Sequence, residues 1–294
     1  MSGSRLSHAY LVGAAICWGL GTVLSKYALN GFDASALLPL QLTCSVMLLS
    51  ACLLASASTL RGIEHPVRLA ALGVLNPGIA YALGLTGLAR IHASTSVTIW
   101  ATEPVLIVLM AFAFLHERLG LWTVLCLAAA LAGVGLIVGA PSAGDPLVGV
   151  ALTLLSVLAC ALYSILLRRM DLKDGTLPVV FLQQASALAF SAVVLLVFAG
   201  RAFGANEPTA AEFASAILSG ALYYGVAFLL YVAGLRRTSA TRAGVSLTLI
   251  PVFGLVFSAV LLGETMGVRQ LMGSTLVIGA MVVLVTRRAV PGGV

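Results

Sequence analysis

A single acidic residue lies deep inside a long apolar stretch, and its chemistry most needs an explanation. Glu103 falls near the middle of the apolar segment 95–115. A charged side chain at the centre of a bilayer costs about 2.5–3.5 kcal/mol, so such residues usually face a cavity or a partner. If the segment is one helix, Ser96, Trp100 and Glu103 share a face. This face predicts a cavity wall where Glu103 contacts a substrate ammonium group or a coupling proton; a protonated, purely structural acid is the alternative.

Other aromatic and amide side chains lie deep inside apolar segments and are candidates for the same cavity. Tyrosine and tryptophan usually mark the membrane interface, but a hydroxyl or an indole N–H in mid-span needs a hydrogen-bond partner. A cavity supplies such partners, whereas packing inside the bundle is the alternative for any single ring. Including the residues around Glu103, the predicted substrate-binding residues are Trp18, Asn76, Tyr81, Ser96, Trp100, Glu103, Tyr163 and Tyr224.

Two prolines and two glutamates recur at matching places along the chain. Pro104 and Pro251 each remove a backbone donor in mid-helix, which predicts either a fixed kink or a gating hinge. Glu117 and Glu264 end their apolar segments, where a carboxylate can accept backbone hydrogen bonds from the start of the next helix. We therefore expect these two glutamates to be structural caps.

No set of residues in the sequence has the spacing of a catalytic or metal-binding site. The four histidines are scattered, and the five cysteines lie in apolar stretches without a CxxC or Cys/His motif. A membrane-embedded enzyme would need several acids, bases or ligands at depth, and Glu103 by itself is too little. The sequence also lacks the GxxxxGKS or GxxxxGKT motif of an ATP site. It therefore predicts neither an enzyme nor a cofactor or metal site.

The composition is that of a membrane protein. Hydrophobic residues make up 61% of the chain and charged residues 9%, with a mean hydropathy of +1.10. Soluble domains average about 25% charged residues. Because lipid offers no hydrogen-bond partner to an exposed strand edge, the long apolar stretches are predicted to be membrane-spanning helices in an all-α fold. Ten such helices are predicted, at 9–30, 35–56, 68–88, 95–115, 120–139, 147–167, 177–199, 212–234, 242–263 and 268–286.

The basic residues predict how these ten helices are oriented. With a cytoplasmic N-terminus, twelve of the sixteen Lys and Arg residues fall on the cytoplasmic side. The exceptions are Lys26, Arg90, Arg201 and Arg269. Cytoplasmic loops carry such an excess in multi-pass proteins, so both termini are predicted to be cytoplasmic. This distribution accounts for the net charge of +6 without a nucleic-acid-binding face.

An internal repeat divides the chain into two halves. The sequence of residues 87–120 is repeated, with substitutions, at residues 234–267, which is a shift of 147 positions in a chain of 294. The first helices of the halves match with a shift of 142. The predicted domains are a first five-helix repeat at 1–143 and a second at 144–294. Because five is odd, the second repeat enters the membrane from the opposite side, as in secondary transporters that alternate access to a site between inverted repeats.

Two segments resemble a known family. CWGLGTVLSKYAL carries Trp-Gly in the first helix, and EPVLIVLMAFAFLHERLG carries Pro, an apolar run and then Leu-x-Glu-x-x-Gly. Both are similar to the ten-helix EamA-type exporters of the drug/metabolite transporter superfamily, and the chain most resembles the bacterial aromatic amino acid exporters among them. The resemblance implies an exporter of small metabolites in the bacterial inner membrane. The second half departs from this pattern, since Cys160 replaces Trp18 and Ile250 replaces Glu103.

The favoured function is therefore export of small amphiphilic metabolites, above all aromatic and other neutral amino acids. A drug carrier on the same scaffold stays open, whereas a nucleotide-sugar carrier would need basic residues in mid-span, and the predicted spans hold none there. Small residues along 120–139 and 268–286 allow close helix approach, either between the halves or between protomers. A monomer or a weak homo-oligomer in the lipid bilayer is expected.

Overall fold

The computed structural model describes residues 3–56, 58, 60, 62–88, 90, 99–100, 102–117, 119–138, 146–170, 174–198, 207–262 and 267–286. The described residues form helices and contain no strand, which confirms the predicted all-α architecture for this part of the chain. The elements are α1 (Gly3–Ala28), α2 (Ala34–Ala55), α3 (Pro66–Gly73), the π-helical η1 (Val74–Ile79), α4 (Ala80–Leu88), α6 (Glu103–Leu115), α7 (Leu121–Val138), α8 (Leu147–Arg169), α9 (Thr176–Phe198), α10 (Ala210–Ser219), the π-helical η2 (Gly220–Val226), α11 (Ala227–Leu235), α12 (Ala240–Ser246), α13 (Leu249–Leu262) and α14 (Val268–Thr286).

Seven helical stretches of the described chain are long and apolar enough to cross a membrane. Three shorter apolar helices, Glu103–Leu115, Leu121–Leu136 and Leu271–Ala280, lie within the other predicted segments. Every predicted segment thus contains a helix, and the count of ten crossings stays a prediction. Local signals set some ends: Pro66 starts α3, and Thr209 and Glu212 form a capping box at α10.

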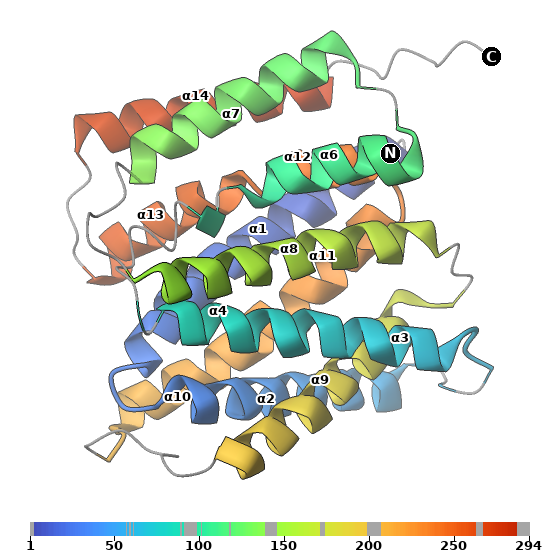
Figure 1. Cartoon of the computed structure of the whole chain (residues 1–294), viewed down its shortest axis with the longest axis vertical. Coiled ribbons are helices and arrows are strands. Elements are labelled where there is room, and N and C mark those ends of the chain that lie inside the picture. Colours follow the sequence, from blue (N-terminus) through green and yellow to red (C-terminus); the bar gives the residue numbers. More distant parts are fainter. Residues whose placement is uncertain are drawn as a thin grey trace.

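Helices from the two sequence halves pack against one another in two overlapping groups, named the α8 bundle and the α1 bundle (Figure 1). In the α8 bundle, α4 and α6 pack against α8, while α3 and η1 pack against α9. In the α1 bundle, α1 packs against α10, η2, α11 and α13, and α2 packs against η2. The bundles meet where α2 contacts α9 and where α6 contacts α12. Helices far apart in the chain therefore surround the region between the bundles.

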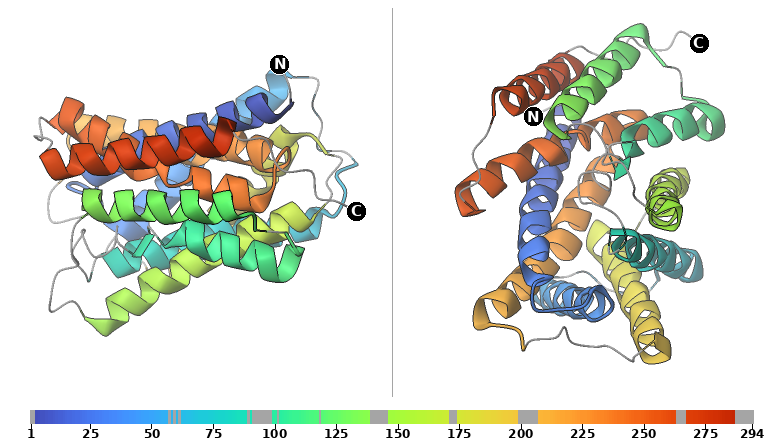
Figure 2. Two further views of the ribbon diagram at one scale, coloured as in Figure 1. Left: turned by 90° about the horizontal axis from the view of Figure 1, so that it is seen from above. Right: turned by 60° about the vertical axis from the view of Figure 1, so that its left-hand side comes forward.

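The helix pair α7 and α14 lies along one edge of the molecule, beside α12 and α13 (Figure 1 and Figure 2). Its small residues serve packing inside the chain at one point: a Cβ atom at Gly133 would lie 2.7 Å from the carbonyl oxygen of Gly273. Gly135 and Gly279 face open space, where a Cβ atom would meet nothing within 4 Å. Helix α7 of the first half and helix α14 of the second half are therefore in close contact at Gly133.

Two glycines at matching positions set the closest helix approaches between the halves. A Cβ atom at Gly220 would lie 2.6 Å from the carbonyl oxygen of Gln41, so η2 touches the backbone of α2. A Cβ atom at Gly73, 147 positions earlier, would overlap the carbonyl oxygen of Gln183 in α9. Only a residue without a side chain permits such backbone contact. Gln41 and Gln183 are themselves 142 positions apart, so both contacts follow the shifts of the sequence repeat.

Candidate functional site

Glu103 lies at a break in the helix that the sequence predicted to be continuous. Residues 99–100 are helical, Thr102 lies in a turn, and α6 begins at Glu103 with Pro104 as its second residue. Proline is favoured at this position because the first-turn N–H groups have no partner within the helix. The prediction of a mid-helix proline was wrong here, since Pro104 starts a helix. The shared face of Trp100 and Glu103 was derived from a continuous helix, so the turn at Thr102 removes that argument and the shared face stays a prediction.

The matching segment of the second half is broken in the same way. It forms α12 and then α13, with Leu247 and Thr248 in a turn between them and Pro251 as the third residue of α13. Both prolines therefore follow helix breaks at corresponding places, and their action as hinges stays a prediction. Discontinuous helices in transporters commonly leave backbone groups free near the bound substrate.

Four aromatic rings from three parts of the chain form a cluster that includes Trp100, which lies just before this break. Tyr81 of α4 stacks on Trp100 at a ring-centroid distance of 5.9 Å and meets Tyr223 and Tyr224 of η2 edge-on at 5.5 and 5.4 Å. Tyr81, Trp100 and Tyr223 are only half-buried, whereas Tyr224 is 3% exposed. The three half-buried rings thus keep part of their surface accessible.

The Glu103 carboxyl belongs to the same neighbourhood. It is half-buried and lies within electrostatic range of Tyr223, Tyr231 and Cys160. Tyr223 also lies close enough to Thr22 of α1 for their hydroxyl groups to interact, and Thr22 is exposed. The arrangement joins one acid with hydroxyl-bearing rings, which suits an ammonium group next to an apolar side chain.

The remaining predicted binding residues divide between the core and the edge of this neighbourhood. Trp18 is 6% exposed and packs against Phe228 and Tyr231 of α11. Asn76 is 6% exposed, in an extended conformation next to Pro77 that interrupts the helical hydrogen bonding of η1, and its Oδ1 atom has no partner among the described residues. Ser96 lies outside the described residues.

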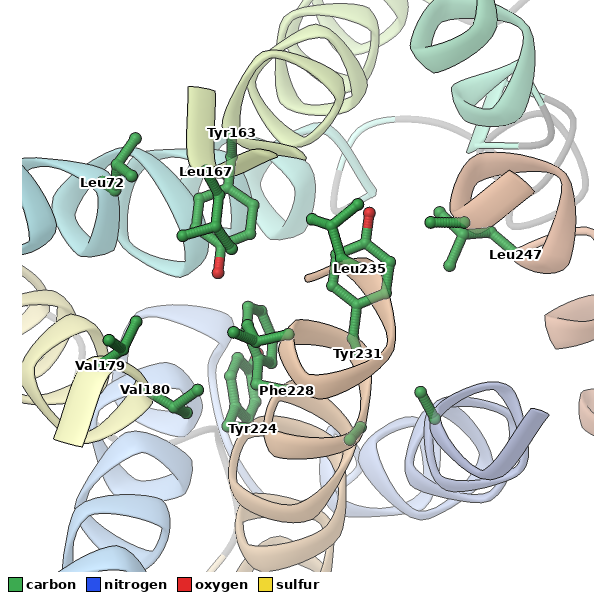
Figure 3. Close-up of a cluster of buried hydrophobic side chains, with 14 of the residues drawn as sticks. Leu72, Tyr163, Leu167, Val179, Val180, Tyr224, Phe228, Tyr231, Leu235 and Leu247 are labelled. Atoms are coloured by element: carbon green, nitrogen blue, oxygen red, sulfur yellow. The ribbon is translucent and has the colours of Figure 1, made fainter. Parts of the chain in front are cut away.

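Tyr163 is part of the buried core and does not line accessible space. It is 0% exposed, and its hydroxyl donates to Oε1 of Gln183 at 2.9 Å. Figure 3 shows its ring projecting from α8 toward Phe228 of α11. The prediction that a cavity satisfies this hydroxyl was therefore wrong, because a glutamine from α9 already does so.

Two site neighbours were missing from the predicted set. Tyr223 and Tyr231 stand on the same broken helix as Tyr224, in the run LYYGVAFLLY, and both lie near Glu103. The signal that could have found them is the repeat itself, since Tyr223 and Tyr231 match Asn76 and Gly84 of the first half at a shift of 147. Cys160 was identified only as the residue that replaces Trp18.

Glu117 caps a helix, but not the helix that the sequence predicted. Its Oε1 accepts from the Ala240 amide at 2.9 Å and its Oε2 from the Thr241 amide at 3.1 Å. These amides begin α12 in the other half, whereas α7 was the expected partner. The preceding His116 has φ 52°, and this left-handed residue ends α6 and turns the chain away. Glu264 lies outside the described residues, and its role as a cap stays a prediction.

A groove along α14 is not part of this site. It has a volume of about 590 Å³ and is lined by apolar residues such as Leu136, Leu271, Met272 and Leu276. None of its lining residues is charged or aromatic. An apolar face of this kind suits lipid contact.

Comparison with known proteins places the chain in a family. The model of the EamA-like transporter family matches residues 5–139 and again residues 147–286. This chain belongs to the EamA-like transporter family. It is therefore a multi-pass membrane transporter, and the family gives no support to an enzymatic activity.

Relatives of this EamA-like transporter agree with the assignment. An uncharacterised transporter of Archaeoglobus fulgidus is 22% identical over 92% of this chain and 95% of its own. An uncharacterised protein of Pseudomonas aeruginosa is 31% identical, and that match covers 58% of each chain. A solved structure, described as the crystal structure of a protein, superposes with a TM-score of 0.81 at 19% identity over 95% of this chain and 96% of its own, which shows the fold.

The tyrosines of this EamA-like transporter should divide into structural and binding residues. Tyr163→Phe removes the donor to Gln183, whose Nε2 atom already lacks a partner among the described residues. We expect a loss of about 1–3 kcal/mol of stability, the usual penalty for an unsatisfied buried polar group, with an unchanged transport KM. Tyr223→Phe is the matched variant at a half-buried ring and should change KM with little effect on the melting temperature. Thermal unfolding and proteoliposome flux measure both, and a KM change in Tyr163→Phe alone would contradict the division.

Proposed function

We propose that this transporter exports small amphiphilic metabolites, foremost neutral amino acids. The observation that carries the proposal is Glu103 at a helix break within electrostatic range of Tyr223, whose ring meets Tyr81, which in turn stacks on Trp100. The carboxylate would bind the substrate ammonium group, and the faces of the rings would hold an apolar side chain and add cation–π attraction. Tyrosine hydroxyls and the indole N–H of Trp100 would donate to the substrate carboxylate.

Alternating access between inverted repeats at 1–143 and 144–294 is the proposed mechanism, in a bacterial inner-membrane protein whose two termini are cytoplasmic. Three observations support it. The family model matches each half separately. Both halves carry a π-helical break, at η1 and η2, and a second break before Pro104 and Pro251. The contacts of Gly73 and Gly220 repeat with the two shifts of the sequence.

Transport by the purified protein in liposomes tests the function. Labelled phenylalanine, leucine, methionine and threonine would be offered with and without an imposed proton gradient, against protein-free liposomes. Saturable uptake of amino acids that depends on the protein would support the proposal. A hydrophobic organic cation without a carboxylate belongs in the same panel, because the acid and rings around Glu103 would also accommodate it. Uptake of the cation alone would assign the protein to the drug carriers.

Specificity among amino acids should be broad. Rings and a single acid provide few directional hydrogen bonds, and such a surface discriminates close analogues only weakly. We expect aromatic and aliphatic neutral amino acids to compete with one another with inhibition constants within about tenfold, a difference of roughly 1.4 kcal/mol. Competition against labelled phenylalanine measures this. Acceptance of one amino acid with rejection of its near-isosteres would contradict the prediction.

A further inference from the structure

A hydrogen-bonded contact joins the two halves of the chain at the end of the molecule that the sequence predicts to be cytoplasmic. Both oxygens of the Glu117 carboxylate accept backbone N–H bonds, from Ala240 at 2.9 Å and Thr241 at 3.1 Å. Glu117 directly follows α6 of the first half of the chain, whereas α12 belongs to the second half. This contact therefore joins the two halves at that end of the molecule.

The start of α12 needs Glu117 because the side chains next to this helix start satisfy only some of its backbone N–H groups. Ser239 precedes the helix, and its hydroxyl accepts from the Arg242 amide at 3.2 Å. The amides of Ala240 and Thr241 are left for Glu117, and unpaired helix-start amides carry partial positive charge that favours an anion. Charge-assisted hydrogen bonds of this kind are among the stronger ones.

Helix α12 packs closely against α6 next to the Glu117 carboxylate. A Cβ atom at Gly244 would lie 2.7 Å from Cγ2 of Ile107, so α12 and α6 are in close contact one turn beyond the cap. Ile107, Ala111 and Ala243 are all 0% exposed in the same hydrophobic cluster. These three side chains between α6 and α12 are therefore closed to solvent in this structure.

We propose that Glu117 is a latch that holds the site closed at the predicted cytoplasmic end, and that its release from Ala240 and Thr241 is a step of the transport cycle. The latch rests on the proposed alternating access. It differs from an ordinary helix cap because the carboxylate and the amides that it binds lie in different halves of the chain. By comparison, Glu212 caps α10 within its own helix start, where its Oε2 accepts from the Thr209 amide at 2.8 Å.

Chemical accessibility of Ala243 tests the latch without a substrate. Ala243→Cys is made in a background that lacks the five native cysteines, and the rate of alkylation by a polar maleimide is measured on purified protein in nanodiscs. With the latch intact, alkylation should be slow because Ala243 is fully buried. Glu117→Gln retains one acceptor atom and loses the second acceptor and the charge, so we expect alkylation to become about tenfold faster or more.

Glu212→Gln is the matched control, since it also removes a carboxylate from a helix start, but the hydrogen bonds of Glu212 lie within the second half. It should leave the alkylation rate at Ala243→Cys unaltered. Equal rates in Glu117→Gln and its parent, or an equal increase in Glu212→Gln, would overturn the latch. If Glu117→Gln does not purify, Glu117→Asp, one methylene shorter, should give the same acceleration. Failure of both Glu117 variants to fold would assign the residue to folding and overturn the proposal.

The latch and the proposed function can fail separately. Faster alkylation in Glu117→Gln with no amino acid flux in the parent protein would leave the latch standing and remove amino acids as the substrate. Amino acid flux in the parent together with unchanged alkylation in Glu117→Gln would support the proposed function and overturn the latch.

Discussion

Glu103→Gln protein should fold normally and transport at no more than about a tenth of the parental rate. Glutamine keeps the shape and can still donate and accept hydrogen bonds, so a purely structural role would survive the change. A carboxylate that pairs with a substrate ammonium or carries a proton would not, because charge-assisted hydrogen bonds are worth about 1.5–3 kcal/mol. Initial flux of labelled phenylalanine into proteoliposomes, together with the melting temperature, gives the answer.

Asp33→Asn is the control for this variant. Asp33 also lies at a helix start, that of α2, but its side chain makes no capping hydrogen bond. Its replacement should change neither flux nor stability. Flux in Glu103→Gln equal to the parent between pH 5 and 8 would show that Glu103 is structural, and the substrate site would then have to be placed elsewhere.

Gly220→Ala should destabilise the protein by about 1–3 kcal/mol, as overpacking a closely packed core does. The new Cβ atom would lie 2.6 Å from the carbonyl oxygen and 2.8 Å from the Cα atom of Gln41, and neither backbone atom can rotate away. Moving α2 would also strain the hydrogen bonds from Gln41 Nε2 to the hydroxyls of Ser25 at 2.8 Å and Ser219 at 2.7 Å. Thermal or denaturant unfolding of the purified protein measures the loss.

Gly279→Ala serves as the comparison, because a Cβ atom there would meet nothing within 4 Å. Alanine in a helix interior is favoured over glycine by roughly 0.5–1 kcal/mol, so this variant should be as stable as the parent or slightly more stable. A Gly220→Ala protein with an unchanged melting temperature would mean that α2 and η2 can separate at no cost.

The sequence determined that this protein is a membrane-embedded helical protein built from related halves. Its long apolar segments leave no other way to satisfy backbone hydrogen bonds in lipid. The sequence also marked Pro104 and Pro251 as places that lack a helical N–H, although it predicted kinks there, and each proline instead lies in the first turn of a new helix. These conclusions depend on short-range chemistry, which each segment carries within itself.

Only the tertiary structure decided which faces of the helices are buried. In a soluble protein an apolar stripe identifies the buried face, but in lipid both the buried and the exposed faces are apolar. Periodicity therefore could not show that Tyr163 is fully buried against Gln183 while Tyr223 keeps accessible surface. It also could not show that the bundles combine helices from both halves.

The partner of Glu117 illustrates the same limit. A glutamate shortly before a helix start predicts a local cap, and the sequence favoured α7 for that reason. The structure instead gives its carboxylate to Ala240 and Thr241, because the left-handed His116 ends α6 and α12 packs alongside it. Backbone amides at the start of every helix are equivalent donors, so the sequence shows only that Glu117 can cap a helix. The packing of α6 against α12 decides which helix it caps.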